Sequence, residues 1–243
     1  MVKIMGIINL TPDSFFEKSR YNYSILKSTA DIVDVGAIST RPGAEDVSQE
    51  EEWRRLKGFV ENWHSEKQLS VDTTRAAIVR KVYEAVGPFI VNDISAGEDD
   101  AQMLKVVGEL ALPYIAMHKR GNPRTMDALA CTDKPIMETL CEYFAEFEKR
   151  AEAAGVKDWI LDPGLGFAKT AAQNVEIIEN LEVLKKFGRP ILIGAADKRF
   201  TEGRTEFYHL EALKHGADIL RVHDVEAANR TYAQYQSYCE HHE

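Results

Sequence analysis

Residues 5–15 read Met-Gly-Ile-Ile-Asn-Leu-Thr-Pro-Asp-Ser-Phe and contain the pattern that recurs along the whole chain. The apolar run from Lys3 to Ile8 shows little alternation, which is typical of a strand buried on both faces. The run stops at Asn9, after which Pro12 and Asp13 favour a turn. A buried strand therefore delivers oxygen-bearing side chains into a loop at its carboxyl end. Such oxygen atoms are the ligands that magnesium prefers.

The succession of apolar strand, polar turn and helix is predicted eight times. The strands are expected at 3–8, 32–35, 69–71, 89–91, 114–117, 159–161, 191–193 and 219–222. The helices are expected at 23–30, 48–63, 76–85, 99–107, 136–154, 172–187, 208–215 and 225–238. Eight such units in 243 residues predict an α/β fold, a (β/α)8 TIM barrel that forms one domain over residues 1–243. An open doubly wound sheet is the alternative, but it requires a Gly-rich phosphate turn after the first strand, which the sequence lacks.

Composition and charge exclude several classes of protein. The net charge of −9 disfavours nonspecific binding to nucleic acid. The three cysteines, Cys131, Cys141 and Cys239, have no metal-site spacing, and their odd number argues against a disulfide framework. No signal peptide and no apolar run long enough to span a membrane are found. We therefore expect a cytoplasmic protein without nucleic-acid or membrane partners.

Polar residues fall repeatedly at or just after the carboxyl ends of the predicted strands. They are Asn9, Arg41, Asp72, Asn92, His118, Asp162, Lys198, Arg221 and His223. Any one of them could be a helix cap or a packed side chain, but a barrel brings all of these positions to one face. A shared site explains the whole set better than nine separate structural roles.

The chemistry of these residues divides into two groups. Asp72, Asn92 and Asp162 suit a flat heterocycle that presents several N–H donors. A second group, which suits a phosphate or pyrophosphate with magnesium as a candidate ion, consists of Asn9, Arg41, Arg221 and His223. The sequence contains no nucleophile elbow and no His-Glu-x-x-His zinc motif. Positioning and leaving-group chemistry is therefore favoured over covalent catalysis.

The motifs of the chain resemble those of the dihydropteroate synthases, within the pterin-binding barrel superfamily. The matching blocks are Asn-Leu-Thr-Pro-Asp-Ser-Phe at 9–15, Ser-Thr-Arg-Pro-Gly-Ala at 39–44, Ser-Val-Asp-Thr at 70–73, Asn-Asp-Ile at 92–94, Met-His at 117–118, Gly-Asn-Pro-Arg-Thr-Met at 121–126, Leu-Asp-Pro-Gly at 161–164, Gly-Phe at 166–167 and Arg-Val-His-Asp-Val at 221–225. They follow the order of the family and cover nearly the whole chain.

The resemblance implies that the amine of 4-aminobenzoate attacks the exocyclic methylene of hydroxymethyl-dihydropterin pyrophosphate, with loss of pyrophosphate. It implies catalytic roles for Asp72, Asp162, Lys198 and Asp13, and a pterin site of Asp72, Asn92, Met117, Asp162, Phe167 and Lys198. Asn9, Arg41, Arg221 and His223 would hold pyrophosphate, with Asn9 as ligand of a Mg²⁺ cofactor. Thr40, Arg41, Pro42 and Arg199 would meet 4-aminobenzoate. Homodimers occur in this family, and its members are sulfonamide targets, so the resemblance also implies these two expectations.

The chain departs from the family pattern after the seventh strand, where Ser-Arg-Lys-Ser is usual. Here the run is Ala196-Asp197-Lys198-Arg199, so that Arg199 replaces the serine that meets the carboxylate of 4-aminobenzoate. An arginine can bind a carboxylate with two hydrogen bonds. The first and seventh helical segments are also expected to be shorter than in the family. Two alternatives follow: a pterin-binding paralogue that is noncatalytic or of altered specificity, and, more remotely, a methyltetrahydrofolate methyltransferase-like pterin domain, which the Leu-Asp-Pro-Gly block would also admit.

Overall fold

A computed structural model describes residues 1–11, 22–38, 47–121, 134–196 and 198–241. Its strands are β1 (Lys3–Asn9), β2 (Ile32–Gly36), β3 (Gln68–Asp72), β4 (Ile90–Asp93), β5 (Tyr114–Met117), β6 (Trp159–Asp162), β7 (Leu192–Ile193) and β8 (Ile219–Val222). They form one parallel sheet in the order β6-β5-β4-β3-β2-β1-β8-β7, and a bridge between Leu161 and Ile191 joins the two ends. The predicted (β/α)8 barrel is confirmed.

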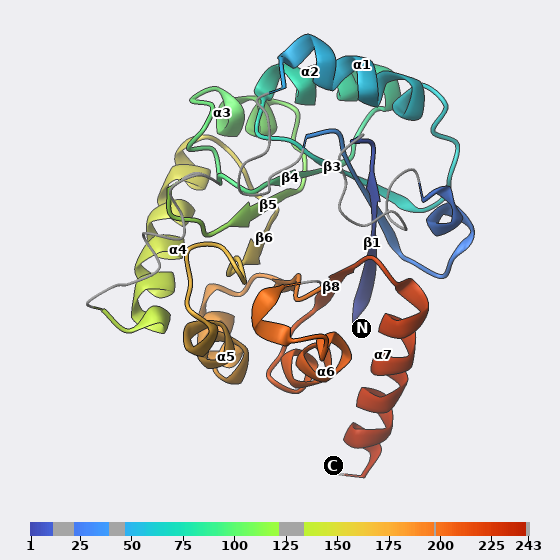
Figure 1. Cartoon of the computed structure of the whole chain (residues 1–243). Coiled ribbons are helices and arrows are strands. Elements are labelled where there is room, and N and C mark those ends of the chain that lie inside the picture. The colour runs from blue at the N-terminus through green and yellow to red at the C-terminus, as the bar shows by residue number, and fades with distance from the viewer. Residues whose placement is uncertain (12–21, 39–46, 122–133, 197, 242–243) are drawn as a thin grey trace.

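Helices surround the strands on the outside of the barrel (Figure 1). They are η1 (Tyr23–Lys27), α1 (Gln49–Val60), α2 (Ala76–Val86), α3 (Met103–Glu109), α4 (Ile136–Ala153), α5 (Ala171–Glu179), η3 (Leu181–Phe187), η4 (Arg199–Thr201), α6 (Thr205–Lys214) and α7 (Val225–Glu240). Within the described residues, the helical segment after β1 is the 3-10 helix η1 of five residues, and α6, the α-helix before β8, has ten.

The predicted helix at 172–187 is divided in the structure. Asn180 leaves the helical conformation, with φ −128°, and its Nδ2 donates to the Glu176 carbonyl at 2.7 Å. This hydrogen bond satisfies one carbonyl at the end of α5, and the chain continues as the 3-10 helix η3. The two segments still pack as one layer, because Ile177, Ile178 and Leu181 are all buried.

The predicted helix at 99–107 begins later, at Met103. The preceding turn is held by Asp100, whose side chain accepts from the backbone N–H groups of Gln102 and, at 2.8 Å, Ala76. An aspartate side chain that bonds nearby backbone competes with the helix and favours a turn. It also satisfies an N–H at the start of α2.

The barrel has two layers of interior side chains that matter for the site. The lower layer is an apolar ring to which seven strands contribute: Met5, Ile32, Ile90, Ile115, Ile160, Leu192 and Ile219. Side chains two residues apart on a strand share a face, so each residue two positions further on also points into the barrel. Those positions include Asp34, Asn92, Met117, Asp162 and Arg221. The apolar ring is thus the floor beneath a layer that is mostly polar.

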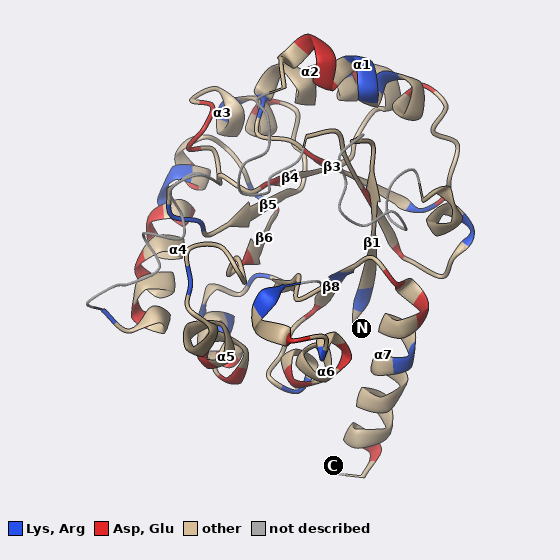
Figure 2. Cartoon of the chain, in the orientation of Figure 1, with Lys and Arg blue, Asp and Glu red and all other residues tan. Residues whose placement is uncertain are grey.

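Acidic and basic residues alternate over the outer helices, and Figure 2 shows both colours on α1, α4 and α7. Within the barrel the same view shows an acidic residue in β6 and a basic residue in β8. Among the described residues, no helix combines the length and the hydropathy that crossing a membrane requires.

Two helical glycines give a direct test of this packing. A Cβ added at Gly108 in α3 would lie 1.9 Å from the Ala154 carbonyl oxygen, whereas one added at Gly58 in α1 would meet nothing within 4 Å. We expect Gly108→Ala to lower the free energy of unfolding by about 1–3 kcal/mol and Gly58→Ala to raise it by about 0.5–1 kcal/mol. Urea denaturation of both variants measures this, and equal effects would contradict the close approach of α3 to the end of α4.

Candidate active site

The centre of the site is an arginine held between two carboxylates inside the barrel. Arg221 on β8 donates from Nε to Asp34 Oδ2 at 2.8 Å, and its Nη2 lies 2.7 Å from the same oxygen. Nη2 also donates to Asp72 Oδ2 on β3 at 3.0 Å. Burial opposes the charge on Arg221, but the two carboxylates outweigh it and raise the pKa of the guanidinium. The sequence predicts that Arg221 binds a phosphate group. In the structure, two of its nitrogens, Nε and Nη2, bind the carboxylates of Asp34 and Asp72.

Asp34 extends this cluster to two further strands. Its side chain is completely buried, and its Oδ1 accepts from Ser70 Oγ at 2.7 Å. Its Oδ2 accepts from Asn92 Nδ2 on β4 at 3.1 Å. A buried carboxylate is tolerated when it is paired and hydrogen-bonded in this way. One anion thus joins side chains of β2, β3, β4 and β8.

The two carboxylates predicted to bind the pterin both have altered acidity. Burial raises the pKa of Asp72 to about 7, although Arg221 partly opposes the shift. Burial also raises the pKa of Asp162, which is 8% exposed, while the Gly164 N–H donates to its Oδ1 at 2.7 Å and works against this. Backbone pairing places Asp72 beside Asn92 and Met117 beside Asp162. The structure therefore brings Asp72, Asn92, Met117 and Asp162 together at the carboxyl ends of β3 to β6, the edge of the barrel that is called the rim below.

The loop after β6 is fixed by a buried lysine. Lys169 Nζ donates to three backbone carbonyls: His118 at 3.3 Å, Gly164 at 2.9 Å and Phe167 at 3.0 Å. Burial lowers its pKa to about 7, whereas three carbonyl acceptors favour the ammonium form, which alone has three N–H donors. Gly164 has φ +70°, and a Cβ there would lie 2.0 Å from the His118 carbonyl oxygen. Only glycine lets this loop pass so close to β5.

Lys198 packs against Phe167 in the loop after β6. The Lys198 ammonium lies 4.3 Å from the centre of the Phe167 ring, within the range of a cation–π interaction. A Cβ added at Gly166 would lie 2.9 Å from Lys198 Cδ, so the glycine leaves room for the lysine stem. These contacts join the loop after β6 to the residue that precedes η4.

The remaining sequence candidates are less tightly placed. Asn9 is the last residue of β1, and His223 directly follows β8. Arg199 is exposed at the first residue of η4. Asp13, Thr40, Arg41 and Pro42 lie outside the described residues. His118, a member of the polar set, is packed: it is 2% exposed, contacts the Tyr143 ring edge-on at 4.8 Å, and burial lowers its pKa to about 2.

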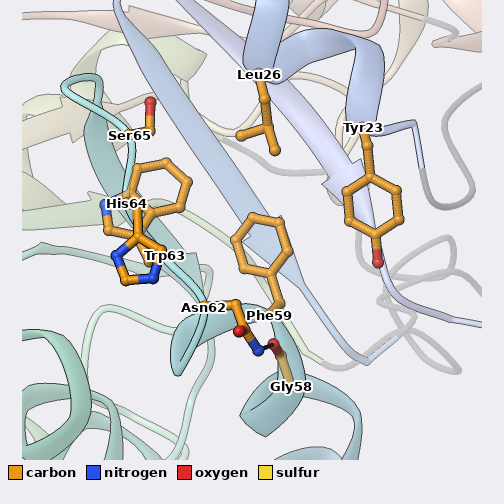
Figure 3. Close-up of a pocket in the computed structure, with 8 residues that line it drawn as sticks. All are labelled: Tyr23, Leu26, Gly58, Phe59, Asn62, Trp63, His64 and Ser65. Carbon is orange, nitrogen blue, oxygen red and sulfur yellow. Dashed lines mark hydrogen bonds between the residues drawn. The ribbon is translucent and has the colours of Figure 1, made fainter.

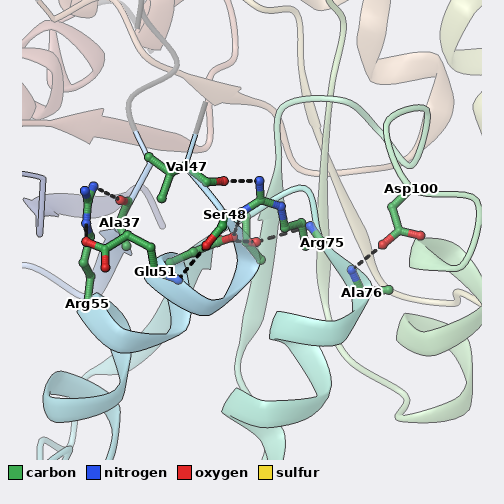
Figure 4. Close-up of polar contacts among 10 residues, drawn as sticks. Ala37, Val47, Ser48, Glu51, Arg55, Arg75, Ala76 and Asp100 are labelled. Atoms are coloured by element: carbon green, nitrogen blue, oxygen red, sulfur yellow. Dashed lines mark hydrogen bonds and ion pairs between the residues drawn. The ribbon is translucent and has the colours of Figure 1, made fainter. Parts of the chain in front are cut away.

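Two arginines fix the described residues on either side of 39–46 (Figure 4). Arg55 on α1 donates to the Ala37 carbonyl at 3.0 Å and pairs with Glu51 at 2.7 Å. Arg75 donates to the Val47 carbonyl and pairs at 2.6 Å with Glu52, which is fully buried. The described residues Ala37 and Val47, which flank positions 39–46, are thus tied to α1 and to the start of α2.

Among the described residues, no group of three or more His, Cys, Asp or Glu side chains could enclose a metal ion. Magnesium that arrives with phosphate groups needs few protein ligands, because it keeps several waters and binds the phosphate oxygens. The amide oxygen of Asn9 at the carboxyl end of β1 fits that requirement.

A pocket of about 420 Å³ lies away from this rim (Figure 3). Its lining consists of Tyr23, Leu26, Gly58, Phe59, Asn62, Trp63, His64 and Ser65. These residues belong to η1, the end of α1 and the chain that leads into β3. The topology of a barrel puts the end of α1 and the start of β3 at the amino edge of the strands, opposite the polar rim.

Sequence reasoning missed Asp34, Ser70 and Lys169 as parts of the site. Asp34 had a usable signal, because an acidic residue inside the apolar run Ile32–Gly36 is rarely buried unless it is paired. Lys169 had none, since one of its three acceptors, the His118 carbonyl, lies 51 residues before it in the chain.

The comparisons with known proteins agree with this arrangement. The model of the pterin binding enzyme family matches residues 5–223. The dihydropteroate synthase of Synechocystis sp. is 38% identical over 92% of this chain and 86% of the relative.

Two solved structures resemble the chain over almost its whole length. The Yersinia pestis dihydropteroate synthase with a sulfonamide drug complex has a TM-score of 0.91 at 29% identity, covering 98% of this chain and 94% of that one. The Xanthomonas albilineans enzyme with 4-aminobenzoic acid has a TM-score of 0.86 at 32% identity, covering 98% and 93%. The chain therefore belongs to the pterin-binding enzyme family and, within it, to the dihydropteroate synthases.

Proposed function

We propose that this chain joins hydroxymethyl-dihydropterin pyrophosphate to 4-aminobenzoate, giving dihydropteroate and pyrophosphate. The observation that carries the proposal is the group of acceptors from Asp72, Asn92 and Asp162 on one rim, with the positive charge of Lys198 near enough to lower the pKa of Asp162. A pterin ring presents N–H groups along one edge and a carbonyl beside them, and such a ring requires several acceptors and a donor. The solved relative with 4-aminobenzoic acid supports the choice of the second substrate.

In the proposed complex, Asp72, Asn92 and Asp162 accept from the ring, and Lys198 donates to it. Met117 and Phe167 provide the apolar surfaces against which a flat ring packs. As the bond to pyrophosphate breaks, positive charge develops on the methylene carbon. The carboxylates of Asp72 and Asp162 then stabilise that charge more strongly than they stabilise the ground state. Asp13 belongs to the catalytic residues of the proposal.

Pyrophosphate binding is assigned to Asn9, Arg41, Arg221 and His223. Nε and Nη2 of Arg221 face Asp34 and Asp72, so, among the described residues, Nη1 is the nitrogen left for an anion. Magnesium, held by Asn9 together with the phosphate oxygens, would supply positive charge to the leaving oxygens. Thr40, Arg41, Pro42 and Arg199 are assigned to 4-aminobenzoate. A homodimer in the cytoplasm completes the proposal, and α6 and α7 carry the exposed Phe207 and Tyr238.

The reaction is tested by pyrophosphate release. We expect release from the pterin pyrophosphate to require both 4-aminobenzoate and magnesium, and Asp162→Asn to lower kcat/KM by about tenfold or more, because a buried acceptor is lost. Asp158→Asn is the matched control, since Asp158 is an exposed residue just before β6, at the other edge of the barrel. Pterin binding without release in the unmutated protein would contradict the synthase and favour the noncatalytic paralogue.

The role of Arg199 is tested separately. Its charge orients the carboxylate of 4-aminobenzoate in the proposal, so Arg199→Ala should raise KM for 4-aminobenzoate about tenfold and leave KM for the pterin substrate unchanged. Steady-state kinetics measures both constants. Arg189→Ala is the control, because Arg189 donates to the Lys157 carbonyl near the amino ends of β6 and β7. Unchanged constants in a variant that still turns over would remove Arg199 from the site.

The pKa of Asp72 predicts a pH dependence of pterin binding. The ionised carboxylate accepts from N–H groups with both oxygens and binds them more strongly than the neutral acid does, and burial raises the pKa of Asp72 to about 7. Lowering the pH from 8 to 6 should therefore weaken pterin binding about tenfold, as the ionised fraction falls. Asp72→Asn should bind more weakly and lose this dependence. Calorimetry across the pH range measures it, and an equal slope in the variant would assign the titration to another group.

A further inference from the structure

Asp34 has a position unlike that of the other carboxylates of the site. It lies in the middle of β2, is completely buried, and neighbours the residues assigned to the pterin without belonging to them. In the described part of the chain, the hydrogen-bond partners of its side chain are polar side chains of the barrel interior: Ser70, Asn92 and Arg221. Asp34 thus contacts one residue assigned to the pterin, Asn92, and one assigned to pyrophosphate, Arg221, from the interior of the barrel.

The contact with Asn92 fixes the direction of an amide. An ionised carboxylate only accepts hydrogen bonds, so the side of Asn92 that faces Asp34 must be its nitrogen, at 3.1 Å. Oδ1 and the second N–H of the amide are then left, in a fixed order, for a ligand on the rim. Without Asp34 the amide could turn over, and its acceptor and donor would exchange places.

The contact with Arg221 fixes a guanidinium in the same way. Asp34 holds both Nε and Nη2, and Asp72 holds Nη2 from the other side. Two of the three nitrogens of Arg221, Nε and Nη2, are therefore held by hydrogen bonds. Oδ2 is the oxygen of Asp72 that accepts from Nη2. The one buried anion orders groups from three strands at once.

We propose that Asp34 is a specificity-determining positioning residue, which sets the order of hydrogen-bond donors and acceptors that the rim presents to the heterocycle. The inference rests on the proposed function, because the ligand is taken to be a pterin. It adds that pterin recognition depends on a residue that does not touch the ligand. The effect passes through Asn92 and Arg221, whose side-chain orientations Asp34 fixes.

The test is Asp34→Asn, which keeps size and shape but can donate as well as accept. We expect the dissociation constant for 6-hydroxymethylpterin and the KM of its pyrophosphate to rise about tenfold or more, with KM for 4-aminobenzoate unchanged. Asp93→Asn is the matched control. Asp93 is equally buried and accepts from Ser95, Gly97 and Tyr114, but it is the neighbour of Asn92 on β4 and so faces away from the barrel interior. This control should lose thermal stability and retain pterin affinity.

Asp34→Glu covers the case in which Asp34→Asn does not fold. It keeps the charge beside Arg221 and moves the carboxylate by one methylene, so pterin affinity should again fall while the protein stays folded. Pterin affinity within about twofold of the unmutated protein in the folded variants would overturn the proposal, and so would an equal loss in Asp93→Asn. Calorimetry with 6-hydroxymethylpterin needs no turnover. A protein that binds the pterin but releases no pyrophosphate would therefore refute the synthase and still decide the role of Asp34.

Discussion

The sharing of one guanidinium between two carboxylates is the interaction on which the interior of the barrel depends. Asp34 and Asp72 lie on neighbouring strands, and Arg221 reaches both from β8 on the far side of β1. Two buried anions without a cation would cost several kcal/mol each, and a lone buried arginine would be as unfavourable. The three charges are tolerable only together. Their common position requires the register that pairs β2 with β3 and β1 with both β2 and β8.

The apolar ring below them makes this possible. Period-two alternation places an isoleucine two residues before Asp34, Asn92, Asp162 and Arg221. The ring fills the lower part of the barrel and limits water from that end, so the charges above it interact in a medium of low dielectric. Within each of these strands, the earlier residue packs in the apolar ring and stabilises the fold, and the residue two positions later belongs to the site. The same short strands supply both the packed floor and the polar rim.

The fold and most of the rim could be predicted because they depend on local patterns. A short apolar run followed by a polar turn identifies a strand and its carboxyl end, and Asp72, Asn92 and Asp162 were found in this way. The partners could not be predicted, because they depend on register. That Asn92 faces Asp34 follows from two strand pairings that the sequence does not state.

The break in the helix at Asn180 was not predicted either. A hydrogen bond from the Asn180 side chain to one carbonyl outweighs a weak helix propensity. The roles of Asp13, Thr40, Arg41 and Pro42 remain predictions.

The closure of the barrel between β6 and β7 has a thermodynamic consequence. The other neighbouring strands are joined by two to five paired residues, but the described chain joins this pair through the single bridge of Leu161 and Ile191. Asp162 lies on one side of this seam and Lys198 follows the strand on the other. A molecule held by both would cross-link the weakest junction of the sheet. Its binding energy would then oppose opening of the seam, so that an occupied barrel would unfold as a more cooperative unit than an empty one.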